Sequence, residues 1–163
     1  MILYKGPFNA AYLRSILCYS PATGHWHWVN PPNKRMQPGA RTAKPAKDGV
    51  CNICILGRQY RASRLAWLYM TGRWPTKFID HKDGDSTNER WSNLRQASRT
   101  QNLANSRLCY RSKSGYKGVT QQGNRFCAKV GKTYLGMFAT VEEASAAYAK
   151  AARKRWGEFA RVR

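Results

Sequence analysis

The spacing of apolar residues in the first half of the chain changes from helical to strand-like and back. Apolar positions recur at helical spacing over residues 10–18, behind the capping residue Asn9, which predicts a short helix. His25 to Trp28 alternate as a strand does, after a turn at residues 21–24. Residues 30–48, rich in Pro, Lys and Arg, are predicted to be a basic loop. The elements predicted next are a hairpin of strands over 50–55 and 59–61 and a helix over 62–70.

The middle of the chain has the pattern of two short strands followed by a helix. Residues 78–81 and 91–95 are predicted strands, separated by a polar turn over 82–87. Ser98 and Gln101 form a capping-box pattern, so a helix should begin there and run to about residue 108. This order brings polar groups of the first strand and of the helix into one small cleft.

The last third of the chain is predicted to be a separate small domain. A linker over 111–115 precedes three predicted strands, over 116–121, 125–130 and 133–138. Thr140 and Glu143 form a second capping-box pattern before a helix with a stripe of small residues. The whole chain is therefore predicted to be α+β, with one domain over 1–110 and another over 114–163.

The net charge of the chain limits the classes of molecule that it is expected to bind. The 163 residues include 29 Lys and Arg against 8 Asp and Glu, a formal net charge of +21. Such an excess predicts contact with a nucleic acid, although charge alone does not separate DNA from RNA. No apolar run approaches the roughly 18 residues of a membrane span, and the first residues lack the order of a signal peptide. The odd number of cysteines, 5, indicates reduced thiols, so we expect a cytoplasmic protein, with no membrane and no protein partner inferred.

Half of the acidic residues gather in residues 78–105. They are Asp80, Asp83, Asp85 and Glu89. In so basic a chain the simplest reason for such a cluster is a divalent cation held against a phosphate. Asp83 and Asp85 lie in the turn-like sequence KDGD, so turn formation is favoured for them over metal binding.

Residues 78–105 resemble the HNH (ββα-metal) endonucleases of phage and intron-homing kind. Asp80 and His81 are adjacent, Asn93 follows His81 by 12 positions, and Asn102 follows Asp80 by 22 positions. The segments YSPATGHWHW at 19–28 and SRLAWLYMTGRWP at 63–75 resemble upstream blocks of phage members, which implies an HNH domain with its core at about 78–108. Ser63 departs from the pattern, because members usually carry His there.

The HNH resemblance implies a role for each polar residue. His81 would be the general base, since neutral imidazole accepts a proton near pH 7. Oxygen ligands suit Mg²⁺ or Mn²⁺, of which one ion is expected. The implied roles are metal binding by Asp80 and Asn102, orientation of the site by Asn93, and contact with flanking phosphates by Arg95 and Arg99.

Residues 114–160 resemble the DNA-binding domain of plant ethylene-response factors, which also occurs behind phage HNH nucleases. The matching stretches are SGYKGV, FCAKV, YLGMF and TVEEASAAYAKAA. The resemblance implies a three-stranded antiparallel sheet plus helix, with the sheet in the DNA major groove. The implied DNA contacts are Lys117, Gln122, Arg125, Lys129, Lys132 and Tyr134. Several of these differ from the usual family residues, so the target sequence should differ as well.

The leading hypothesis is a metal-dependent endonuclease that cuts double-stranded DNA, of homing-like or phage-encoded kind. A DNA-binding regulator without catalysis is the alternative, and Ser63 is the feature that favours it. An RNA-binding protein is disfavoured, because the major groove of A-form RNA does not admit a sheet. Zinc bound by Cys51 and Cys54 with His25 and His27 is also less favoured, because the flanks of the cysteine pair alternate like a strand.

Overall fold

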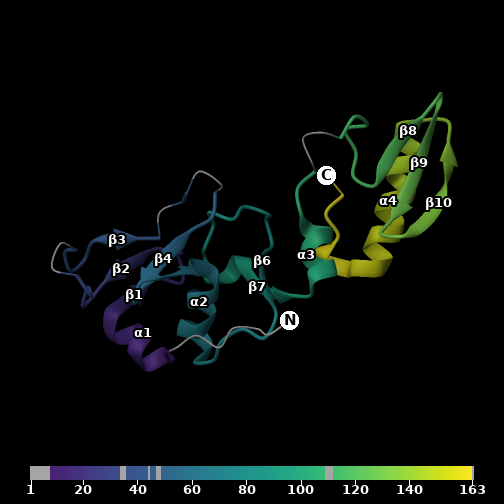
Figure 1. The fold of residues 1–163 in the computed structure, drawn as a ribbon. Helices are drawn as coiled ribbons and strands as arrows, with labels where there is room; N and C mark the ends of the chain where they lie inside the picture. The colour runs from purple at the N-terminus through teal and green to yellow at the C-terminus, as the bar shows by residue number, and fades with distance from the viewer. Residues whose placement is uncertain (1–7, 34–35, 44, 47–48, 109–111, 163) are drawn as a thin grey trace. The chain divides into compact units, whose positions relative to one another are not determined.

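The computed structural model describes residues 8–33, 36–43, 45–46, 49–108 and 112–162. The chain divides into two compact units, Met1–Ala97 and Ser98–Arg163, and each is described by itself (Figure 1). Both units combine helices with small antiparallel sheets, which confirms the α+β class. The helix that follows Ser98 lies in the second compact unit, and the predicted domain boundary at residues 110–114 stays a prediction.

The first helix, α1 (Ala10–Ile16), is capped as predicted, because the Asn9 side chain accepts a hydrogen bond from the Tyr12 N–H over 2.9 Å. The predicted end at residue 18 is wrong. Residues 17–19 form strand β1 (Leu17–Tyr19), which pairs with β2 (Trp26–Trp28). Residues 17–19 adopt the strand conformation, although their apolar spacing also fits a helix. In the strand, alternate residues of β1 and β2 are buried, including both Trp side chains.

A third strand lies in the segment predicted to be a basic loop over 30–48. β3 (Arg41–Thr42) pairs with β2, so the sheet has the order β1-β2-β3. Part of the predicted loop, residues 34–35, 44 and 47–48, lies outside the described residues. A strand of two residues shows no periodicity in the sequence. β3 could therefore be recognised only from its pairing with β2 in the structure.

The predicted hairpin and helix that follow are confirmed. β4 (Asn52–Ile55) pairs with β5 (Arg58–Arg61), and the turn between them has positive φ at both Leu56 and Gly57. Two consecutive positive φ values are the mark of a type I′ turn, which matches the twist of a hairpin. Helix α2 (Ala62–Thr71) follows at once and ends at Gly72, whose φ of 75° is left-handed.

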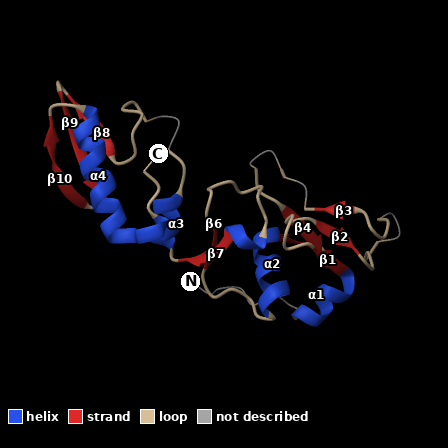
Figure 2. Ribbon diagram, turned by 180° about the vertical axis from the view of Figure 1, so that it is seen from behind, coloured by secondary structure: helices blue, strands red, loops and turns tan. Residues whose placement is uncertain are grey.

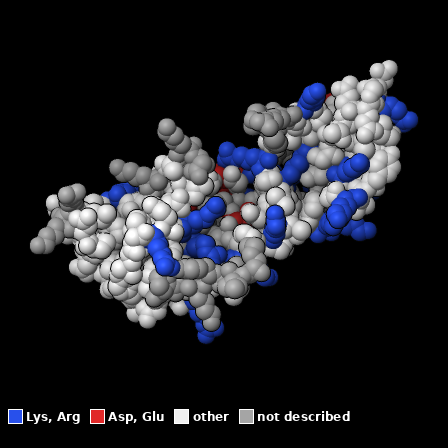
Figure 3. Space-filling model, in the orientation of Figure 1, with Lys and Arg blue, Asp and Glu red and all other residues white. Residues whose placement is uncertain are grey.

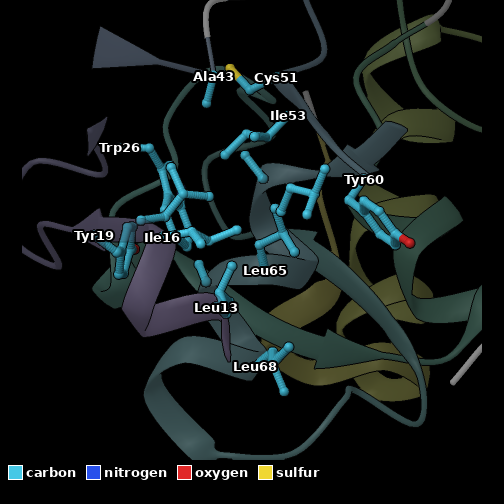
Figure 4. Packing of buried hydrophobic residues seen from close by; sticks show 14 of the residues in the cluster. Leu13, Ile16, Tyr19, Trp26, Ala43, Cys51, Ile53, Tyr60, Leu65 and Leu68 are labelled. Atoms are coloured by element: carbon cyan, nitrogen blue, oxygen red, sulfur yellow. The ribbon is translucent and has the colours of Figure 1, made fainter. Parts of the chain in front are cut away.

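These elements share one hydrophobic core. Its largest fully buried side chains come from α1, β1, β2, β4 and α2; they are Leu13, Leu17, Trp26, Ile53, Ile55, Leu65 and Leu68. Figure 4 shows how Leu13, Trp26, Ile53, Leu65 and Leu68 pack together. Ile79 and Trp91 pack against the same core. The core thereby holds the two-stranded ribbon that carries the candidate site.

That ribbon consists of β6 (Phe78–His81) and β7 (Leu94–Ala97), with Asp80 opposite Arg95. The predicted second strand over 91–95 begins too early, because Trp91–Asn93 is a short 3₁₀ helix, η1. The Trp91 N–H donates to the Pro21 carbonyl over 3.0 Å and the Asn93 N–H to the Arg90 carbonyl over 2.9 Å. Both donors are therefore used away from β6, and pairing starts only at Leu94.

The second unit begins with α3 (Arg99–Asn105), whose capping box between Ser98 and Gln101 is confirmed. The helix ends at Asn105, short of the predicted residue 108. Strands β8 (Val119–Gln122), β9 (Arg125–Val130) and β10 (Thr133–Phe138) form an antiparallel sheet of order β10-β9-β8. The first strand starts later than predicted because Gly118, with φ 69°, turns the chain against the Tyr148 ring.

Helix α4 (Val141–Trp156) lies along one face of that sheet (Figures 1 and 2). The Thr140–Glu143 capping box is present, as predicted. Small side chains such as Ala144 and Ala152 are fully buried against Ala128 and Val130 of β9, which lets the helix approach the sheet closely. A 3₁₀ turn, η2 (Gly157–Phe159), ends the unit. Within the part of the chain that is described, no helix has both the length and the apolar character that a bilayer crossing requires.

Candidate functional site

Asp80 and His81 lie side by side at the end of β6. The Asp80 side chain is 4% exposed, and its Oδ2 accepts a hydrogen bond of 2.8 Å from Nε of Arg95 on β7. Arg95 is itself largely buried. A residue predicted to hold a flanking phosphate is thus already in contact with the predicted metal ligand, and its charge offsets that of the buried carboxylate.

The His81 ring faces a second buried acid. Its Nε2 lies 3.6 Å from Oε2 of Glu89, and both side chains are shielded from solvent. That separation is an ion-pair distance rather than that of a formed hydrogen bond. His81 is therefore a ring base with a carboxylate at one nitrogen, which is a common arrangement for a residue that moves protons.

The Asn93 amide holds the loop between the strands. Its Nδ2 donates to Oδ1 of Asp83 over 3.0 Å and to the Asn88 carbonyl over 2.8 Å, and its Oδ1 accepts from the Asp83 N–H over 3.1 Å. The Asn93 carbonyl also accepts from the Lys82 N–H. Asn93 thus fixes the chain on either side of the 82–92 loop, next to His81.

Asp83 and Asp85 form the turn, as predicted. Oδ1 of Asp83 accepts from the Asp85 N–H over 2.8 Å, and Oδ1 of Asp85 accepts from both the N–H and the hydroxyl of Thr87. Burial alone would raise the pKa of Asp83, but hydrogen bonds from Asp85, Asn88 and Asn93 outweigh it and lower the pKa. Both carboxylates are therefore used inside the loop.

Glu89 is a buried acid of this site to which the sequence analysis assigned no role. It is 4% exposed, and burial raises its pKa, while the His81 ring, the Ser63 N–H and Arg61 act in the opposite direction. Ser63, which stands at the family His position, is also buried and contributes that backbone N–H from the first turn of α2. The sequence did contain one indication of a role for Glu89. It is the fourth acidic residue of the 78–105 segment, in a chain with only 8 Asp and Glu residues.

The donor chemistry around Asp80 fits a hard divalent ion, but with few protein ligands. No group of three or more His, Cys, Asp or Glu side chains able to hold a metal occurs among the described residues. Mg²⁺ commonly takes one or two carboxylates and leaves its other positions to water and phosphate. Asn102, the other predicted ligand, is half-buried on α3 in the second unit, so its pairing with Asp80 stays a prediction.

The zinc alternative gains no support from the cysteine pair. Cys51 is buried and Cys54 exposed, which follows the alternation of β4 and directs the two thiols to opposite sides. Burial, reinforced by Glu89, raises the pKa of Cys51 to about 11. A thiol in that environment is a poor metal ligand, because the ligand form is the thiolate.

The sheet of the second unit presents several of the predicted DNA contacts together. Cross-strand partners share a face, and Gln122 pairs with Arg125 while Lys129 pairs with Tyr134. All four side chains are exposed, in contrast to Ala128 and Val130, which face α4. Lys132, in the turn between β9 and β10, is exposed as well. This outer face of the sheet is open to a partner.

Lys117 and Arg99 are placed differently from each other. The Lys117 Nζ donates to the carbonyls of Leu103, Ala104 and Ser106 over 3.3, 2.5 and 2.6 Å at the end of α3. Arg99 is exposed on the first turn of the same helix. Lys117 therefore already serves as a cap for α3, whereas Arg99 is accessible to a phosphate.

One comparison with known protein families concerns the segment around these residues. Residues 60–104 match the HNH endonuclease family model. The HNH match runs from the end of β5 through the β6–β7 ribbon to α3 and includes Asp80, His81, Asn93 and Asn102. It supports an HNH endonuclease domain in this segment of the chain. No curated protein and no solved structure matches the chain.

Proposed function

We propose that the chain is a metal-dependent endonuclease that hydrolyses phosphodiester bonds in double-stranded DNA. The observation that carries this proposal is the adjacent pair Asp80 and His81 at the end of β6, inside the residues of the HNH match. The strong positive charge agrees with a nucleic-acid substrate, since Lys and Arg side chains are spread over the surface (Figure 3).

Asp80 and Asn102 are the proposed ligands of one Mg²⁺ or Mn²⁺ ion. Bound there, the ion would stabilise the negative charge that develops on the phosphate during attack. Asp80 supplies an anionic oxygen and Asn102 a neutral one, both of which are hard donors. Arg95 keeps the Asp80 carboxylate in a fixed orientation through its 2.8 Å hydrogen bond.

His81 is the proposed general base. A neutral imidazole can take a proton from the attacking water as the oxygen approaches phosphorus. Asn93 supports this step by fixing the loop that follows His81 through its hydrogen bonds to Asp83 and Asn88. The exposed Arg99 is the proposed contact for a flanking phosphate.

The outer face of the β8–β10 sheet is the proposed docking surface for duplex DNA. Arg125 and Lys129 supply charge, and Gln122 and Tyr134 supply groups that can contact base edges. Lys132 lies at the rim. We rank Lys117 last among the predicted contacts, because three carbonyls of the unit already accept its hydrogen bonds.

A DNA-binding protein without catalysis is the second candidate function. Two observations favour it: Ser63 replaces the usual family His, and Arg95 is in contact with the proposed metal ligand. In that case the outer sheet face would still dock on DNA. Asp80 and His81 would then only stabilise the fold and would take no part in catalysis.

A nicking assay separates the two functions. Supercoiled plasmid is incubated with the full chain and Mg²⁺ or Mn²⁺, and a parallel sample contains excess EDTA. The proposal expects nicked or linear DNA with metal and intact plasmid with EDTA. DNA that is bound in a band-shift assay but never cut under any metal condition would establish the non-catalytic alternative.

A further inference from the structure

Glu89 is a buried acid for which the proposed mechanism has no task. It is 4% exposed, and the carboxylates that form the turn of this loop are those of Asp83 and Asp85. Burying a carboxylate is costly unless its oxygens are satisfied and its charge has a use. The contacts of Glu89 should therefore show which interaction its buried charge supports.

Three contacts from two separate segments hold Glu89 and its neighbours in place. The Tyr19 hydroxyl donates to the Glu89 carbonyl over 2.6 Å, across 70 positions of sequence. The Trp91 N–H donates to the Pro21 carbonyl over 3.0 Å, which ties the same turn to the other side of Glu89. The carboxylate accepts the Ser63 N–H at the first turn of α2, where unsatisfied N–H groups favour an anion.

The YSPATG segment thereby gains a structural explanation. At Gly24 a Cβ atom would lie 2.5 Å from the Glu89 carbonyl carbon, so only glycine allows the turn to approach this closely. The motif is a clamp on the backbone of residues 89–91. The clamp and α2 together place Oε2 of Glu89 at 3.6 Å from Nε2 of His81.

We propose that Glu89 is a positioning residue that fixes the ring orientation and the tautomer of His81. This inference rests on the proposed nuclease function of the same site. A carboxylate can only accept a hydrogen bond, so it favours the His81 tautomer with its proton on Nε2. The acceptor lone pair then lies on Nδ1. In sites without substrate such hydrogen bonds are often long and shorten in the reacting complex.

The proton balance of the step follows from this arrangement. The attacking water would give one proton to Nδ1 of His81, and its oxygen would form the new bond to phosphorus while the P–O bond to the leaving sugar oxygen breaks. The leaving oxygen would then take a proton from solvent water. The ring becomes an imidazolium ion whose Nε2–H still faces Glu89. The negative charge of Glu89 stabilises that cation at the moment it forms, as the carboxylate beside the catalytic His of serine proteases does.

The first test is the isosteric substitution Glu89→Gln, assayed by single-turnover cleavage at saturating protein. The amide oxygen can still accept the Ser63 N–H, but its NH₂ group would then face the ring and favour the wrong tautomer. The rate constant should fall by roughly 10²- to 10⁴-fold with DNA affinity unchanged. Glu142→Gln, the same chemical change at an exposed position of α4, is the matched control and should keep the wild-type rate.

A double variant distinguishes positioning from mere structural support. If Glu89 acts through the imidazole, His81→Ala/Glu89→Gln should cleave no more slowly than His81→Ala. A further drop in rate, or a wild-type rate for Glu89→Gln alone, would overturn the inference. Glu89→Asp keeps a carboxylate and should recover part of the rate that Glu89→Gln loses.

A readout that needs no activity completes the test. The chain has only 3 histidines, so ¹⁵N-resolved NMR of the imidazole rings at pH 8, with His81→Ala for assignment, reports the His81 tautomer directly. We expect the Nε2–H form in wild type and in Glu89→Asp, and a shift toward Nδ1–H in Glu89→Gln. An unchanged tautomer would reject the positioning role. The expected shift in a chain that never cuts DNA would reject the proposed function alone.

Discussion

Nε of Arg95 donates a 2.8 Å hydrogen bond to Oδ2 of Asp80, directly across the β6–β7 ribbon. The sequence suggested one role for Arg95 and Arg99, contact with flanking phosphates. The structure separates them, because the Arg95 side chain is 11% exposed against a carboxylate that is 4% exposed, whereas Arg99 is exposed on α3. Arg95 is part of the packed β6–β7 ribbon, and Arg99 is a surface residue of the second unit.

This difference predicts unequal effects on stability. Arg95→Ala leaves the Asp80 carboxylate buried without its cation and should lower the free energy of unfolding by about 3–5 kcal/mol. Arg99→Ala, at an exposed position, should change it by less than about 0.5 kcal/mol. Urea denaturation followed by Trp fluorescence measures both, since Trp156 alone among the 6 Trp residues lies in the second unit. Equal losses for the two variants would contradict the assignment.

The clamp at Gly24 predicts a contrast between two glycines with the same backbone conformation. Gly24 has φ 76° and Gly39 has φ 79°, but only a Cβ at Gly24 would meet other atoms, the backbone of Glu89 and Arg90. Either Ala substitution should cost about 1 kcal/mol through left-handed strain. Gly24→Ala should cost about 1–3 kcal/mol more, because the turn must move away. Thermal denaturation of both variants checks this, and similar melting temperatures would argue against the clamp.

Lys117 and Lys129 should respond differently when their charge is removed. Lys129→Met removes an exposed cation of the outer sheet face and should lower the salt dependence of DNA affinity by about one unit of slope. Lys117→Met removes the cap of α3 and should destabilise the second unit with little effect on that slope. Band-shift titrations at several salt concentrations, with circular dichroism melts beside them, measure both effects. A larger change in slope for Lys117 would restore it as a DNA contact.

The thiol of Cys51 should resist alkylation at pH values where ordinary thiols react. Its pKa is raised from 9.0 to about 11, first by burial and then by Glu89. The native state therefore keeps a proton that the unfolded chain loses above pH 9, and the stabilisation from this thiol is lost as pH rises through 11. Alkylation of the native protein at pH 8, followed by peptide mapping, should label the exposed Cys54 and spare Cys51. Comparable labelling of the two would show that Cys51 is accessible.

Local patterns predicted much of the fold. The caps at Asn9, Ser98 and Thr140 are all present, because each depends on residues only three positions apart. The ends of elements were less predictable. Leu17 fits helical spacing, yet it belongs to β1 because its strand partner Trp28, eleven positions away, competes for its backbone hydrogen bonds.

The candidate site was only partly predictable for a related reason. Asp80 and His81 could be found because they are adjacent and precede a spaced pair of Asn residues. The tasks of Glu89 and Lys117 could not, because they depend on contacts with Tyr19 and Ser63 and with the end of α3. Such contacts form only when distant segments pack together, and no spacing in the sequence encodes them.

The most direct measurement of the central claim is the cleavage rate of His81→Ala compared with its DNA affinity. Single-turnover cleavage of plasmid with Mg²⁺ or Mn²⁺ gives the rate, and a band-shift titration in EDTA gives the affinity. If His81 is the general base, the rate should fall by roughly 10²- to 10⁴-fold while the affinity stays within about twofold. Cleavage by His81→Ala at the wild-type rate would contradict the account.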